Sequence, residues 1–118
     1  MGSLRPLPAA FYRRPADVVA RDLLGRYLVR ELAGERLVLR LVETEAYLGA
    51  ADAASHARGG HRSARNASMY LAGGHAYVYF VYGLHWCLNV VCAERDVPHA
   101  VLLRAGEALS LIHISEPT

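Results

Sequence analysis

Two glutamates and a tyrosine that could take part in acid–base chemistry follow an apolar, strand-like segment. The run RLVLRLV carries a leucine at every second position and leads directly into ETEAYLG. In a regular strand, Glu43, Glu45 and Tyr47 would therefore point the same way as the leucines. A carboxylate at the end of an apolar row is unfavourable unless it is paired, solvated or used chemically.

The two acids could have different roles. One could pair with an arginine and be structural, while the other could lie at the rim of a pocket and accept a proton from water. An ion pair is the default explanation for any single acid. A glycosidase would need carboxylates on opposite sides of a sugar, whereas Glu43 and Glu45 lie side by side on one strand.

Flat, polar-tipped side chains lie near the predicted strand ends and in the loop that follows the acids. They are Tyr47, His56, Tyr77, Tyr79 and Tyr82. Nucleic-acid bases stack on such rings for about 1–3 kcal/mol each. Tyrosines are also common in strands for ordinary packing reasons, so this set is informative only beside a pocket carboxylate. Together the two features predict an enzyme that takes a base out of a duplex.

From position 48 to position 68 the chain is rich in small residues and basic residues. Long connections of this kind often carry function. Arg58, Arg62 and Arg65 could hold the phosphates of a DNA backbone there. A solvated surface excursion is the alternative that the pattern leaves open.

The basic residues are all arginine, thirteen in number, and the net charge of +2 is compatible with nucleic acid without requiring it. The chain has no lysine, so a Schiff-base enzyme would have only the N-terminal amine. Cys87 and Cys92 lie in an apolar region, which indicates buried thiols in a reducing compartment. Together with His85 they lack the paired CxxC spacing of a zinc site, and we expect no metal.

Turn signals and periodicity divide the chain into a helix and several strands. Pro15 suits the first turn of a helix that Gly25 would end. Segments 26–32 and 35–47 are predicted to form a hairpin with its turn around Ala33. Further strands are expected at 76–83 and 84–93, and within PHAVLLRAGEAL, positions 98–109, a strand that ends on Arg104. The predicted fold is α+β, a single domain with a mainly antiparallel, curved sheet and flanking helices.

The charge-free stretch at positions 76–93 has the length of a membrane span. Its first half alternates like a strand, which favours a buried strand pair instead. We therefore expect no membrane association.

The last ten residues, LSLIHISEPT at positions 109–118, break from the preceding pattern. They resemble the in-frame translation of a sequencing-library adapter. We therefore expect native sequence at positions 1–108 and a non-native tail after it, which would make the domain incomplete.

Four segments, in this order, closely resemble the alkyladenine (3-methyladenine) DNA glycosylase family, also called methylpurine glycosylases. They are RLVETEAYLG, ASHARGG with the following ARN, AYVYFVYGLHWCLNVV and AVLLRA. The resemblance extends over nearly the whole chain up to about Ala108. It implies a DNA repair enzyme that flips a damaged base out of the duplex.

The resemblance also implies which residues act on the reacting bond. Glu45 aligns with the general base that activates water for attack on the sugar C1′. Arg104 aligns with an arginine near the reactive water and the backbone phosphate. Glu43 would then be structural.

Further residues would contact the DNA if the resemblance holds. Tyr47, His56 and Tyr79 match residues that enclose the flipped base. Asn89 matches the residue that crowds the exocyclic amine of normal guanine. Tyr82 matches the wedge that enters the minor groove and fills the vacated space.

The implied chemistry is simple, because a purine alkylated at N3 or N7 is cationic and already a good leaving group. Aromatic faces favour such a cation. Without a lysine, we expect direct hydrolysis that leaves an abasic site and no strand cleavage. We expect no cofactor, double-stranded DNA with damaged purines as the partner, a monomer, and a location in the bacterial cytoplasm at the nucleoid.

Two other interpretations remain open. The chain could be a non-catalytic DNA-binding fragment in which the pocket is incomplete. It could also be a small β-rich ligand-binding domain whose acids form ion pairs. Salt-sensitive DNA binding without an abasic product favours the first, and the absence of DNA affinity at low salt favours the second.

Overall fold

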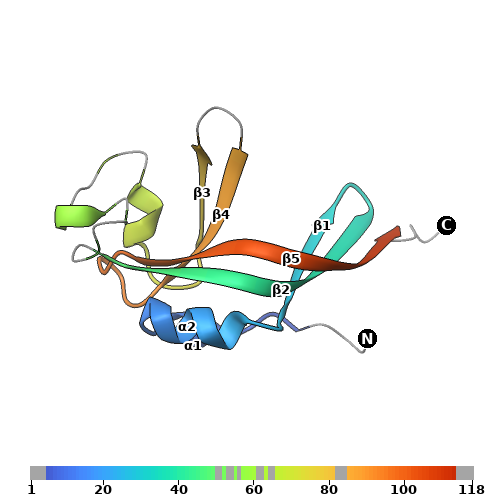
Figure 1. Ribbon diagram of the computed structural model, residues 1–118, viewed down its shortest axis with the longest axis horizontal. Helices are drawn as coiled ribbons and strands as arrows, with labels where there is room; N and C mark the ends of the chain where they lie inside the picture. The colour runs from blue at the N-terminus through green and yellow to red at the C-terminus, as the bar shows by residue number, and fades with distance from the viewer. Residues whose placement is uncertain are drawn as a thin grey trace.

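The computed structural model describes residues 5–49, 52, 55, 57–60, 63, 66–81 and 85–113, without the side chains at positions 32, 58, 79–81, 85, 86 and 110–113. In chain order the elements are α1 (Ala9–Tyr12), α2 (Ala16–Leu23), β1 (Tyr27–Leu32), β2 (Glu35–Leu48), the 3-10 helices η2 (Arg58–Gly60) and η3 (Ala67–Tyr70), β3 (Ala76–Val81), β4 (His85–Cys92) and β5 (His99–His113) (Figure 1).

The five strands form one antiparallel sheet in the order β1-β2-β5-β4-β3. The long strands β2 and β5 run along the molecule, and β3 and β4 bend away from them. Helices α1 and α2 lie against the side of β2 and β5 that is opposite to β3 and β4 (Figure 1). The predicted α+β class, with a curved antiparallel sheet and flanking helices, is confirmed. Strand β5 continues past its expected end, and His113 pairs with Glu35. The origin of segment 109–118 stays a prediction.

The hairpin between β1 and β2 forms at the predicted turn. Ala33 has φ 52° and Gly34 has φ 79°. Positive φ at both central residues is what a type I′ turn requires, and its twist matches that of the flanking strands. The hairpin prediction is confirmed, with Leu32 paired to Glu35 beside the turn.

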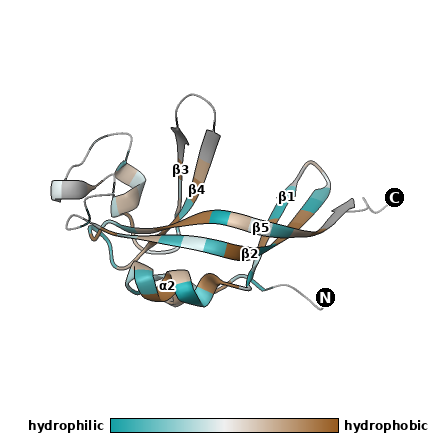
Figure 2. Cartoon of the chain, in the orientation of Figure 1, coloured by the Kyte–Doolittle hydropathy of each residue, from teal (hydrophilic) through white to brown (hydrophobic). Residues whose placement is uncertain are grey.

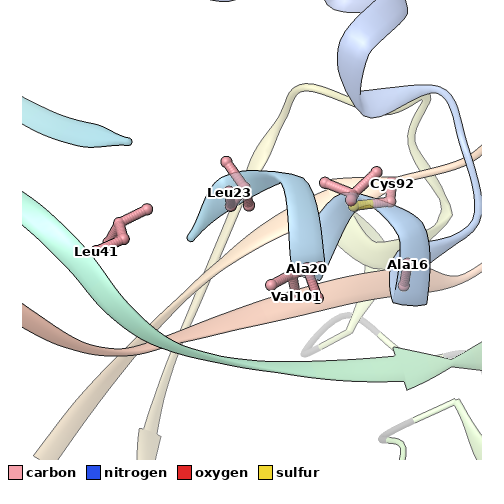
Figure 3. Close-up of a cluster of buried hydrophobic side chains, with 7 residues drawn as sticks. Ala16, Ala20, Leu23, Leu41, Cys92 and Val101 are labelled. Carbon is pink, nitrogen blue, oxygen red and sulfur yellow. The ribbon is translucent and has the colours of Figure 1, made fainter. Parts of the chain in front are cut away.

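Helix α2 begins and ends where the sequence indicates. Pro15 is its N-cap, Asp17 lies in its first turn, where the helix dipole favours a negative charge, and Gly25 follows its end with φ 83°. Polar and apolar residues alternate along the helix (Figure 2). Its apolar face meets the sheet in a core made of Ala16, Val19, Ala20, Leu23, Leu41, Cys92 and Val101 (Figure 3).

The two cysteines differ in burial. Cys92 is buried in the α2 core, and Cys87 is half-buried. Burial raises the pKa of the Cys92 thiol to about 12, an effect that the nearby Arg14 only partly offsets. The thiol is therefore protonated and unreactive at neutral pH, as a structural cysteine should be. The prediction of buried thiols is confirmed for Cys92.

His99 of β5 caps the start of α2. Its Nδ1 accepts a hydrogen bond from the backbone N–H of Ala16 at 3.1 Å. This supplies the acceptor that the N-cap, Pro15, does not have. Burial lowers the pKa of His99, and the nearby Asp17 raises it to a smaller extent. The folded chain therefore favours the neutral imidazole.

We expect the variant His99→Gln to lose part of the pH dependence of stability. Because the pKa of His99 is lower in the folded than in the unfolded state, the unfolded state binds more protons between these two values. Stability from this group is thus complete above the ordinary histidine pKa of about 6.5 and falls as the pH drops toward the folded pKa. The steepest slope possible is about 1.4 kcal/mol per pH unit.

Glutamine keeps a side-chain acceptor but does not titrate in this range. Thermal unfolding of both proteins between about pH 5 and pH 8 measures the difference. Parallel stability curves for the two proteins would contradict this assignment of His99.

A β-bulge interrupts strand β2 just before the two glutamates. The pairing of β2 with β5 shifts between Leu41 and Glu43, so Val42 has no partner. A bulge of this kind moves the following side chains to the other face of the sheet. Leu41 packs in the α2 core, and beyond the bulge Ala46 packs against that same core.

The expected continuation of the leucine row is therefore wrong. Thr44 faces α2, because its hydroxyl donates to the backbone carbonyl of Ala20 at 2.8 Å. Its neighbours Glu43 and Glu45 lie on the opposite face. The two acids thus avoid the α2 core, and their desolvation is not the problem that the regular pattern suggested.

The face of the sheet away from α2 is partly covered by the chain between β2 and β3. A second buried core lies there and consists of Ala57, Met69, Tyr70, Tyr77, Val91 and Ala100. Within the 48–68 stretch Ser55, Ala57 and Asn66 are buried, so the alternative of a solvated surface excursion is wrong at these positions, whereas Gly59 and Gly60 are exposed. The stretch at 76–93 contains the paired strands β3 and β4, as expected. Within the described ranges, no helix has the length and apolar character needed to cross a membrane.

Candidate active site

Glu45 and Asn89 lie on either side of strand β5, on the face opposite α2. Glu45 pairs with Leu102 across β2 and β5, and Leu102 pairs with Asn89 across β5 and β4. Residues that pair directly share a face of the sheet. Neighbouring strands lie about 5 Å apart, so the backbones of β2 and β4 are roughly 10 Å apart here. A carboxylate and a carboxamide thus flank Leu102.

Both carboxylate oxygens of Glu45 have polar neighbours. The Tyr47 hydroxyl donates to Oε1 at 2.9 Å, and Nη1 of Arg104 donates to Oε2 at 3.2 Å. The side chain of Glu45 nevertheless remains 41% exposed. The structure therefore brings Glu45, Tyr47 and Arg104 together and leaves the carboxylate open to water.

A second bulge brings Arg104 to the acids. The pairing of β2 with β5 shifts again between Glu43 and Thr44, and Arg104 has no partner in it. The guanidinium reaches both acids, with Nε 3.7 Å from Oε2 of Glu43 and Nη1 3.2 Å from Oε2 of Glu45. One arginine therefore serves both carboxylates, and the cluster carries one net negative charge.

These ion pairs are expected to contribute little to stability. Arg104 and Glu43 are 57% and 61% exposed, and exposed pairs contribute about 0–1 kcal/mol. The variant Arg104→Ala should therefore change the free energy of unfolding by less than about 1 kcal/mol, as measured by urea unfolding.

Arg40→Ala is the matched control, because Arg40 pairs with Glu107 across the same two strands. A loss of several kcal/mol for Arg104→Ala alone would show that the arginine holds the strands together instead of serving the site.

Asn89 is a fixed and buried part of the same face. Its side chain is almost fully buried, and its Nδ2 donates to the backbone carbonyl of Tyr77 at 3.2 Å. The ring of Tyr77 is buried in the core beneath the 49–75 connection. Tyr77 was one of the aromatic candidates, and the structure makes it a packing residue.

Several predicted site residues lie outside the described residues. They are His56, Arg62, Arg65 and Tyr82, together with the side chains of Arg58 and Tyr79. The backbone of Tyr79 is described and pairs with Cys87. The roles of all six stay predictions.

The two bulges that assemble this site were not predicted from the sequence. A signal for the bulge at Val42 exists in the residues that follow it. Thr44 and Ala46 are small enough to lie under α2, whereas Glu43 and Glu45 are unsuited to burial. The bulge at Arg104 has no comparable signal that we can identify.

The sequence of the chain was compared with those of known protein families. The family described as Methylpurine-DNA glycosylase (MPG) has a sequence model that matches residues 10–117. The chain belongs to the methylpurine-DNA glycosylase family. The resemblance seen in the four motifs is confirmed, and Glu45, Asn89 and Arg104 all lie within the matched range.

Curated relatives of this methylpurine-DNA glycosylase family member are similar over most of its length. A protein from Methanocella arvoryzae is 54% identical over 103 residues, which are 87% of this chain and 51% of the relative. One from Natranaerobius thermophilus is 51% identical over 100 residues, 85% of this chain and 50% of the relative. One from Clostridium acetobutylicum is 47% identical over 104 residues, which are 88% of this chain and 51% of the relative. All three carry the name "Putative 3-methyladenine DNA glycosylase". The chain therefore spans about half the length of these relatives.

Proposed function

We propose that this chain contains the catalytic face of a DNA glycosylase that removes alkylated purines, 3-methyladenine among them. The observation that carries the proposal is the position of Glu45. Its carboxylate is open to solvent, contacts the Tyr47 hydroxyl and Arg104, and lies across β5 from the buried Asn89. Family membership and the names of the relatives support the same reaction.

In the proposed reaction Glu45 accepts a proton from a water molecule, which attacks the sugar C1′ of the flipped nucleotide. The Tyr47 hydroxyl and the Arg104 guanidinium hold one carboxylate oxygen each and so orient the group. The N-glycosidic bond breaks with its electron pair going to the purine, which is cationic while attached and leaves as a neutral base, so it needs little further help to leave. The net negative charge of the Glu43, Arg104 and Glu45 cluster suits the positive charge that develops on the sugar.

The bound base would lie over the sheet face between Glu45 and Asn89. Tyr47, His56 and Tyr79 would enclose it, and stacking on such rings contributes about 1–3 kcal/mol per base. Asn89 is held in place by its hydrogen bond to the backbone carbonyl of Tyr77, which suits a residue that crowds the exocyclic amine of normal guanine and so disfavours that base. Tyr82 would fill the gap left in the duplex. Arg58, Arg62 and Arg65 would hold phosphates, which makes binding sensitive to salt.

The test is the release of free base from alkylated double-stranded DNA. The 118-residue chain is incubated with methylated DNA, alone and together with the unmatched portion of the Methanocella relative, and free 3-methyladenine is measured by chromatography. We expect free base and intact abasic strands, because the chain has no lysine for a Schiff-base step. Absence of free base in both preparations, under conditions in which DNA is bound, contradicts the proposal.

A second candidate is a non-catalytic DNA-binding fragment. The observation that favours it is that the chain spans about half of its curated relatives. Salt-sensitive binding by the chain alone, with free base released only after the unmatched portion is added, would assign catalysis to the longer polypeptide.

A further inference from the structure

An open groove lies on the α2 face of the sheet, opposite the candidate active site. Its volume is about 960 Å³. Its floor and walls are largely apolar and include Leu7, Leu23, Leu28, Leu41, Val90 and Leu103. Neither Glu45 nor Asn89 lines it, so its role is separate from the proposed excision of bases.

The chain exposes more surface than a closed domain of its mass. Its accessible surface is 7802 Å², whereas a folded monomer of this mass, 12.9 kDa, exposes about 6,300 Å². Its radius of gyration is 15.3 Å, against about 13.5 Å for a compact domain of this length. The excess of roughly 1,500 Å² is what one side of a large obligate interface covers.

Part of this excess is apolar and borders the groove. Tyr27 of β1 lines the groove and is 47% exposed, and Leu24, at the end of α2, is exposed close by in the sequence. Leu28 and Leu103 pack against the α2 core from the groove side and are only partly buried. Exposed apolar side chains gathered around a groove normally mark a place where another polypeptide segment packs.

We propose that this groove seats the portion of the family polypeptide that lies outside the matched region. The curated relatives are about twice as long as the range they share with this chain, so the unmatched portion is large enough to cover the exposed surface. Arg5, Arg26 and Arg36 line the groove with one acid, Glu31, which forms an ion pair with Arg36 and leaves the charges of Arg5 and Arg26 in excess there. The seated segment should therefore be amphipathic, with acidic residues next to its apolar face. This inference rests on family membership, not on the proposed activity.

The test mixes the full 118-residue chain with the unmatched portion of the Methanocella relative, produced separately. We expect a one-to-one complex in size-exclusion chromatography with light scattering. Amides of β1 should exchange with solvent more slowly in the complex, by roughly tenfold or more, while those of β3 should be unchanged. This exchange measurement needs no variant and no enzymatic activity.

A matched pair of variants locates the contact. Tyr27 on the edge strand β1 and Val97 in the turn between β4 and β5 are exposed to similar extents, 47% and 41%. Tyr27→Glu places a charge in the groove and should weaken the complex by roughly tenfold or more. Val97→Glu adds the same charge outside the groove lining, in the turn before β5 near the start of α2, and should leave the affinity unchanged.

Several results would overturn the proposal. No complex, equal affinities for the wild-type chain and Tyr27→Glu, or equal weakening by both variants would each do so. A dimer of the chain that Tyr27→Glu dissociates would show that a second copy occupies the groove instead. Loss of base release with an intact complex would count against the proposed function alone.

Discussion

Glu45→Gln should abolish the release of alkylated base while DNA binding persists. The amide keeps the size of the side chain and can still meet the Tyr47 hydroxyl, but it cannot accept a proton from water. A positioned general base contributes about 10²–10⁴-fold to a rate, so release should fall by at least about 10²-fold. Chromatography of free base measures the rate, and fluorescence anisotropy of labelled DNA measures binding.

Glu107→Gln is the matched control for this variant. Glu107 lies on the neighbouring strand β5 and also pairs with an arginine, Arg40, across β2 and β5. It is remote from Tyr47 in the pairing of the two strands, and its replacement should leave the rate unchanged. Undiminished release by Glu45→Gln, with Glu107→Gln equally active, would remove Glu45 from the role of general base.

Gly73→Ala should produce the largest loss of stability among single methyl additions to the described glycines. Gly73 is buried, and a Cβ added to it would lie 2.5 Å from the backbone oxygen of Tyr12 and 2.7 Å from its carbonyl carbon. The Gly73 N–H donates to Ala93, and the Ala93 N–H donates to Tyr12, so the three backbones are locked together. Because backbone atoms must move, we expect a loss at or above the usual 1–3 kcal/mol for overpacking.

This junction ties the end of the 49–75 connection, which packs on the same sheet face as the candidate site, to the last residue of α1, so the variant tests how the site is supported. Urea unfolding followed by circular dichroism gives the change in free energy. Gly60→Ala is the control, because Gly60 has φ 78° but no atom within 4 Å of an added Cβ. It should show only the smaller cost of a left-handed backbone, about 1 kcal/mol. Equal losses for both variants would mean that the contact with Tyr12 is easily relieved.

Local signals in the sequence were sufficient for the helix and the hairpin. Pro15 and Gly25 bound α2 because a proline fixes the first turn and a glycine adopts the positive φ beyond the last. The turn at Ala33 forms between strands that are adjacent in the chain, so its geometry depends only on neighbouring residues. The strands before β5 were also found near their expected bounds, whereas β5 extends beyond Arg104 to His113.

The face on which Glu43 and Glu45 lie could not be read from the same signals. Alternation in ERLVLRLVETEAY predicts one continuous row, and one unpaired residue, Val42, reverses it. That bulge exists because β2 must pair with β5 while Leu41 and Ala46 both pack against the α2 core. The hydrogen bond between Arg104 and Glu45 joins residues that are 59 positions apart, and no local pattern encodes such a contact.

The sequence by itself determined the family, the α+β class and the residue types available for the chemistry, because motifs, caps and turns are local properties of the chain. Only the tertiary structure decided that the acids face away from α2, that one arginine meets both of them, and that Tyr77 packs in a core. The physical reason is that these features depend on the register between strands distant in the sequence. They also depend on which face of the sheet is covered by α2 and which by the 49–75 connection. Both are set by the packing of the whole sheet.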